Sequence, residues 1–83
     1  MQSFSYTPRG VCSRQIEFSI EDGKLCDVRF TGGCDGNLKA ISMLVEGSDA
    51  REIADLFRGN TCGRRPTSCA DQFATAIDLA LEE

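Results

Sequence analysis

The hydrophobic period changes once along this chain, at Gly32, and the change separates a strand-forming part from a helix-forming part. Before it, apolar residues alternate with polar ones, as at Ile16, Phe18 and Ile20, which is typical of a strand with one buried face. After it, apolar residues recur every three or four positions, as in amphipathic helices. We therefore expect an α+β fold, a small antiparallel three-stranded sheet followed by three helices packed on one face.

A tight hairpin is predicted between the second and third strands. Asp22-Gly23 separates two alternating runs, and a two-residue type I′ turn needs positive φ at both positions, which Asp and Gly tolerate best. The first strand is shorter, because it contains Phe4 and Tyr6 and must end before Pro8.

The third strand, residues 24–31, contains Cys26, whose burial can be predicted from the alternation of the strand. Simple alternation places Cys26 in one row with Val28 and Phe30. Because buried free cysteines behave as small hydrophobes, Cys26 is predicted to be part of the core.

Three helices are predicted after Gly32, each with an apolar stripe. Asp49, with Glu52 three residues later, is a capping-box start for the second, and Thr67 or Ser68 caps the third. The stripes are Leu38, Ile41, Leu44 and Val45, then Ile53, Leu56 and Phe57, then Phe73, Ala76, Ile77, Ala80 and Leu81. No linker or repeat interrupts the pattern, so residues 1–83 are expected to form a single domain.

Size and charge exclude several classes of protein. A chain of 83 residues buries a modest core and often needs a disulfide, a metal or a partner subunit for stability. A net charge of −4 argues against a nucleic-acid or anionic-membrane surface. The chain has no His, so a metal must be bound by thiolates or carboxylates.

The start of the chain has no basic segment followed by an apolar one, and no apolar run approaches the ~20 residues that span a bilayer. A cytoplasmic location is therefore expected. Thiols stay reduced there, which favours metal or redox chemistry over structural disulfides.

Four cysteines lie beside glycine or at the start of a predicted helix: Cys12, Cys34, Cys62 and Cys69. No pair has the C-x₂-C spacing of common zinc modules, so spacing leaves several hypotheses open. In the first hypothesis the four share a metal, with zinc as the default and iron or an iron–sulfur cluster as the competitor. Alternatively, two form a disulfide relay, or all four are unrelated small buried residues.

The redox hypothesis centres on Cys69, the first residue of the third helix. Unpaired N–H groups and the helix macrodipole favour negative charge there, and Arg64 and Arg65 add positive charge. In this hypothesis the chain passes electrons to a partner protein. Cys69 is the attacking thiol, and Cys62 or Cys34 is the thiol that resolves the resulting disulfide. No other residue of the chain suggests a catalytic site.

A nucleotide-sensing or docking function is the third hypothesis, centred on the glycine-rich turn at residues 32–38. A turn between a strand and a helix can bind phosphate. The turn lacks both G-x-G-x-x-G and the P-loop lysine, so a capping role is favoured.

Four segments together resemble the small TSCPD-domain, or four-cysteine, proteins: GCDGNLK at 33–39, LVEG at 44–47, CG at 62–63 and TSCADQ at 67–72. Ala70 departs from the motif, which has proline there. A similar domain occurs near the C-terminus of vitamin B12-dependent (class II) ribonucleotide reductases.

The resemblance implies that Cys12, Cys34, Cys62 and Cys69 are the matched set and that Cys26 is extra. It implies a metal-binding accessory module, with zinc as the expected cofactor, acting beside a ribonucleotide reductase or another protein. The chain is too short for the reductase's barrel and cobalamin site, so we expect no catalysis by the chain alone. A ribonucleoside-diphosphate reductase label would be borrowed from the shared domain. A homodimer is also expected, because so small a sheet gains from more buried area.

Overall fold

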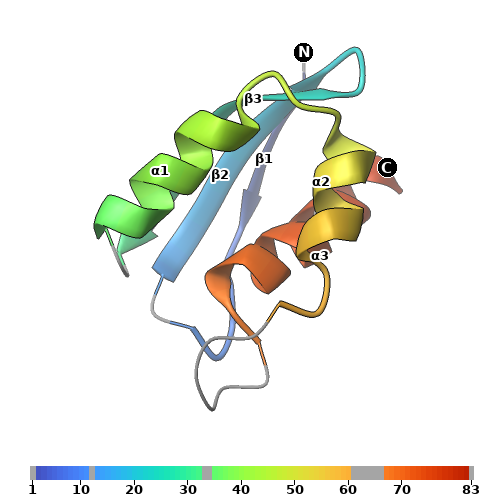
Figure 1. Cartoon of the computed structure of the whole chain (residues 1–83). Coiled ribbons are helices and arrows are strands. Elements are labelled where there is room, and N and C mark those ends of the chain that lie inside the picture. The colour runs from blue at the N-terminus through green and yellow to red at the C-terminus, as the bar shows by residue number, and fades with distance from the viewer. Residues whose placement is uncertain (1, 12, 33–34, 61–66, 83) are drawn as a thin grey trace.

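The computed structural model describes residues 2–11, 13–32, 35–60 and 67–82. In these residues three strands precede three helices: β1 Gln2–Tyr6, β2 Ser13–Glu21, β3 Lys24–Gly32, α1 Asp35–Val45, α2 Ala50–Phe57 and α3 Cys69–Leu81. The strands form an antiparallel sheet in the order β1-β2-β3, and the helices cover one face of it (Figure 1). The predicted α+β fold is confirmed.

The turn between β2 and β3 has the predicted geometry. Asp22 has a φ of 53° and Gly23 a φ of 78°, so both turn positions are left-handed. Glu21 pairs with Lys24 directly across the turn, as in a two-residue hairpin.

A β-bulge interrupts the ladder between β2 and β3. Glu17 pairs with Arg29 and Ser19 pairs with Cys26, so Phe18 alone on β2 is opposite two residues of β3. One of those two residues is Asp27, which has a φ of 53°, a conformation that Asp adopts more readily than most residues. The bulge therefore inserts one extra residue into β3.

The bulge overturns the prediction for Cys26. Leu25 and Val28 both face the core: Leu25 has no exposed surface, and the exposed fraction of Val28 is 6%. Cys26 is half-buried and pairs with Ser19, whose neighbours on β2 are core residues, so Cys26 lies on the opposite face of the sheet. Cys26 does not share a row with Val28, because the extra residue between them reverses the alternation.

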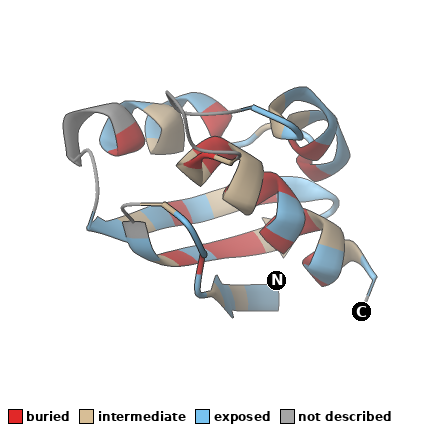
Figure 2. Ribbon diagram, turned by 90° about the horizontal axis from the view of Figure 1, so that it is seen from below, coloured by how far each residue is buried: buried red, intermediate tan, exposed pale blue. Residues whose placement is uncertain are grey.

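The core is centred on Phe73 of α3, which has no exposed surface. Its ring contacts three other rings, with centroids 5.4 Å from Phe18, 5.5 Å from Phe30 and 6.4 Å from Phe57. These partners come from β2, β3 and α2, so one side chain joins the sheet to two helices. Figure 2 shows the buried residues gathered between the sheet and the helices.

Two predicted core residues are exposed instead. Leu44 is 79% exposed on α1 and Leu56 is 73% exposed on α2. On α2 the fully buried residues are Ala50 and Ala54, because small side chains let a helix approach its neighbours closely. Because the face of α2 with Ala50 and Ala54 packs against the core, Leu56 lies on the outward face of the helix. No helix in the described part of the chain is long and apolar enough to cross a bilayer.

Candidate functional site

The sheet end at which β2 begins and β3 ends brings together the neighbours of two predicted site cysteines. Ser13, the first residue of β2, pairs with Gly32, the last residue of β3. Cys12 directly precedes Ser13, and Cys34 follows Gly32 by two residues and directly precedes α1. We call this end of the sheet the cysteine end.

The connection from β1 to β2 contacts the beginning of α3. The Gln72 side-chain oxygen accepts hydrogen bonds from the Tyr6 hydroxyl at 3.2 Å and from the Arg9 backbone N–H at 3.1 Å. Thr67 Cγ2 lies 3.5 Å from the position that a Cβ on Gly10 would occupy. Residues just before Cys12 therefore lie against residues just before Cys69.

Ser68 forms hydrogen bonds to Asn60, and these two residues lie on either side of Cys62 in the sequence. Ser68 is the N-cap of α3, as predicted, and its Oγ accepts the Asp71 backbone N–H at 3.0 Å. The Ser68 hydroxyl also donates to the Asn60 backbone oxygen at 2.7 Å, and Asn60 Nδ2 donates to Ser68 Oγ at 3.0 Å. The residue two before Cys62 thus contacts the residue one before Cys69.

Asp71 forms hydrogen bonds to residues on both sides of residues 60–66. Its carboxylate accepts hydrogen bonds from the Thr67 hydroxyl and, at 2.8 Å, from the Gly59 backbone N–H. These two hydrogen bonds, the one from Thr67 foremost, lower the pKa of the Asp71 carboxyl. The ionised form is therefore favoured.

The structure describes one of the four predicted site cysteines. Cys69 is half-buried at the first position of α3, so its predicted place at a helix start is confirmed. Cys12, Cys34 and Cys62 lie outside the described residues. Among the residues that are described, no group of three or more Cys, Asp or Glu side chains could hold a metal ion.

The other predicted site segments also fall largely outside the described residues. Arg64 and Arg65, predicted to add positive charge near Cys69, are not described. In the glycine-rich turn, Gly33 and Cys34 are not described, and α1 begins directly afterwards at Asp35.

Cys26 lies near the other end of β3. It is six residues from Gly32, which corresponds to about 20 Å along a strand. Burial raises the pKa of the Cys26 thiol, and the negative charges of Asp27, Glu46 and Glu21 raise it further. Cys26 is thus less suited to acting as a thiolate, which agrees with its separation from the other four.

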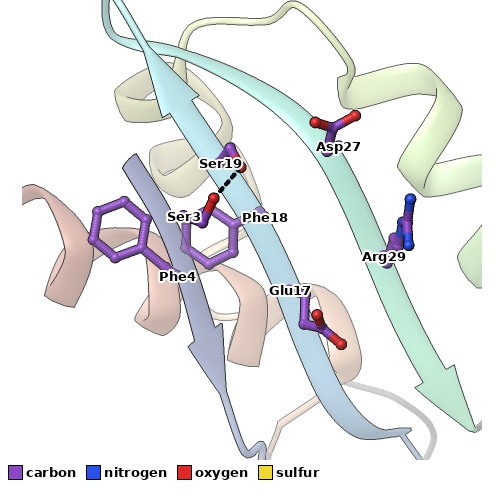
Figure 3. A pocket seen from close by; sticks show the side chains of 7 residues that line it. All are labelled: Ser3, Phe4, Glu17, Phe18, Ser19, Asp27 and Arg29. Carbon is purple, nitrogen blue, oxygen red and sulfur yellow. Dashed lines mark hydrogen bonds between the residues drawn. The ribbon is translucent and has the colours of Figure 1, made fainter. Parts of the chain in front are cut away.

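The open face of the sheet has a shallow polar hollow of about 240 Å³, drawn in Figure 3. Ser3 Oγ and Ser19 Oγ lie 2.9 Å apart across β1 and β2, within hydrogen-bonding distance. Glu17, Asp27 and Arg29 add charges of both signs. The hollow pairs no nucleophile with a general base among these residues.

Sequence reasoning did not find the polar residues that organise the cysteine end. From the sequence alone, Asn60 marks the end of the second predicted helix, and Asp71 and Gln72 are only part of the TSCPD motif. Their hydrogen bonds reach residues 8 to 66 positions away, so no local pattern signals them.

Replacing Ser68 by alanine is expected to lower the free energy of unfolding by about 2 kcal/mol, because both the helix cap and the hydrogen bond to the Asn60 backbone oxygen are lost. Urea unfolding followed by circular dichroism measures the change. Ser42→Ala is the matched control, since Ser42 only donates to the Leu38 carbonyl within α1. That control should cost less than about 0.5 kcal/mol. Equal losses would contradict the role given to Ser68.

Comparison with known proteins identifies the family. The family model of the TSCPD domain matches residues 1–81. No curated protein and no solved structure matches the chain. Since the match covers almost the entire sequence, including all five cysteines, the chain belongs to the TSCPD domain family.

Proposed function

We propose that this chain is a zinc-binding accessory module, not catalytic by itself, in which Cys12, Cys34, Cys62 and Cys69 bind one zinc ion. The supporting observation is that described neighbours of all four cysteines meet at the cysteine end.

Three contacts support this proposal. Ser13 pairs with Gly32, Gly10 lies against Thr67, and Asn60 is hydrogen-bonded to Ser68. Each of the four cysteines is one or two residues from a member of these pairs. Because a chain extends by at most about 3.6 Å per residue, each cysteine Cα is within about 7 Å of such a neighbour. That reach is compatible with four sulfurs around one ion at the usual Zn–S distance of about 2.3 Å.

The available donors also suit zinc. The chain has no His, and the Asp71 carboxylate, two residues from Cys69, is already engaged by Thr67 and Gly59. Four thiolates remain, a donor set typical of structural zinc sites. When bound, zinc would supply a cross-link between the start of β2, the β3–α1 junction and the start of α3. A small core gains most from such a cross-link.

A role beside a larger enzyme fits the same proposal. The TSCPD domain resembles the accessory domain of class II ribonucleotide reductases, so a reductase or another protein is the proposed partner. The module would contribute stability and a docking surface, and the chemistry would belong to the partner.

Elemental analysis of protein purified without added metal tests the proposal. We expect about one zinc per chain in the unaltered protein and in Cys26→Ser, and a large loss of zinc in Cys69→Ser. A folded protein with less than about 0.2 zinc per chain would overturn the proposal. Iron accompanied by visible absorption would assign an iron–sulfur site instead. Reversible loss of two thiols under mild oxidant, without metal, would favour the redox hypothesis.

A further inference from the structure

A groove runs between strand β3 and helix α1, at the edge of the sheet away from β1. We call it the β3–α1 groove. One hollow of about 330 Å³ is lined by Val28, Arg29, Phe30 and Thr31 of β3 and by Lys39, Ser42 and Met43 of α1. A second hollow, of about 480 Å³, shares Val28, Arg29, Ser42 and Met43 and extends to Asp27 and Glu46. Both volumes are in the range of ligand sites.

This edge of the sheet already accepts a strand. The segment after α1 pairs with the beginning of β3, where the Leu25 N–H donates to the Ser48 oxygen at 2.8 Å. The Gly47 N–H donates in turn to the Leu25 oxygen at 2.7 Å, and Asp49 forms an antiparallel bridge with Lys24. The outer edge of β3 is therefore accessible to another extended segment.

The pairing stops at the bulge. The Asp27 N–H donates to Glu46 Oε1 at 2.9 Å, so the side chain of Glu46, the residue directly after α1, ends the ladder there. From Val28 to Gly32, no described backbone group pairs with the outer edge of β3. This unpaired stretch is the strand side of the groove. Figure 3 shows Arg29 on this stretch and Asp27 directly before it.

The groove has an exposed apolar side chain at its centre. Met43 and Val28 line both hollows; Met43 is 71% exposed, Val28 is 6% exposed and Phe30 is half-buried. An unbranched, polarisable methionine adapts to differently shaped partners, which explains its frequent use at peptide-binding surfaces. An aliphatic side chain of a bound segment would cover Met43.

The charges at one end of the groove are all positive. Arg29 and Lys39 are the only charged residues lining the smaller hollow, and both are exposed. Neither forms an ion pair with a described residue. Asp27 and Glu46 give the other end of the groove negative charge, so a carboxylate is favoured at the end with Arg29 and Lys39.

We propose that the β3–α1 groove binds an extended, acidic peptide segment of a partner protein. The segment adds a strand to β3 beyond the bulge, sets an aliphatic side chain against Met43 and Val28, and directs an acidic side chain to Arg29 and Lys39. Backbone hydrogen bonds supply affinity and the two side-chain sites supply selectivity, as in other proteins that bind peptides by strand addition. The proposal does not depend on the metal site.

Selection from a library of random linear nine-residue peptides tests the groove. The library is displayed on phage and selected against the protein as purified. We expect enriched peptides that combine a glutamate or aspartate with an aliphatic residue. In ¹⁵N-labelled protein, the enriched peptide should shift the amide resonances of residues 27–32 and 39–46. Blocking alternate peptide N–H groups by methylation should abolish binding, because the added strand could not form.

Charge reversal supplies the matched comparison. Arg29→Glu with Lys39→Glu should weaken the enriched peptide at least about tenfold, and Met43→Glu by a similar factor. Arg14→Glu with Lys24→Glu reverses two exposed cations outside the groove and should change affinity less than about twofold. Circular dichroism confirms that each variant is folded.

Four outcomes would overturn the proposal. The first is a library without enrichment, and the second is an enriched peptide that binds both double variants equally. The third is a set of shifted resonances confined to β1 and β2. A chain that sedimentation shows to be dimeric, and that Met43→Glu converts to a monomer, would assign the groove to a second copy and also refute the proposal.

Discussion

Replacing Phe73 by alanine is expected to lower the free energy of unfolding by about 3–5 kcal/mol, the usual cost of removing a buried phenylalanine ring. Phe73 has no exposed surface, and its ring contacts the rings of Phe18, Phe30 and Phe57. The cavity would separate the sheet from α2 and α3 together, so neighbouring side chains could not close it by a local shift.

That loss is large for a chain of this size. The free energy of unfolding of native proteins is roughly 0.05–0.15 kcal/mol per residue, so a total of about 4–12 kcal/mol is expected for this chain. Urea unfolding followed by far-ultraviolet circular dichroism measures the change. Leu79→Ala, on the same helix but 50% exposed, is the control and should cost less than about 1 kcal/mol. Similar losses in both variants would mean that Phe73 is not the centre of the core.

Removing the proposed zinc is expected to have an effect of comparable size. Zinc-finger peptides gain about 10–16 kcal/mol from their metal, because the site does not exist in the unfolded chain. If only about 3 kcal/mol of such binding contributes to folding here, a strong chelator should lower Tm by roughly 12–24 °C. Differential scanning calorimetry with and without chelator measures the shift.

Two variants separate metal loss from other effects of the chelator. Cys26→Ser, altered near the far end of β3, should show the same drop in Tm as the unaltered protein. Cys69→Ser should start from a lower Tm and respond little to the chelator, because its site is already broken. A Tm that the chelator leaves unchanged in the unaltered protein would contradict a structural zinc.

Features with local causes could be predicted from the sequence. Asp49 and Ser68 cap α2 and α3 as expected, because a cap needs only a side-chain oxygen within three residues of a free N–H. The Asp22-Gly23 turn is equally local, since its positive φ angles depend on the residues themselves. The order of strands and helices followed from the change of hydrophobic period.

Features that depend on packing could not be predicted in this way. Leu44 fits a helical stripe, but α1 contacts the sheet through Leu38 and Val45 and leaves Leu44 in solvent. Cys26 fits a strand row, but the bulge at Asp27 reverses that row. Glu46 accepts the N–H of Asp27 from 19 positions away, and such a partner is visible only in three dimensions.

For the candidate site, the sequence by itself predicts which cysteines belong together. Glycines and helix starts mark Cys12, Cys34, Cys62 and Cys69, and the family motif matches the same four. Only the tertiary structure decided that their described neighbours meet at one end of the sheet and that Cys26 lies near the other. The physical reason is that the chemistry of each residue can be read from the sequence, whereas the distance between residues depends on the tertiary structure. That distance is set by strand register and by hydrogen bonds between distant segments, such as that of Tyr6 to Gln72.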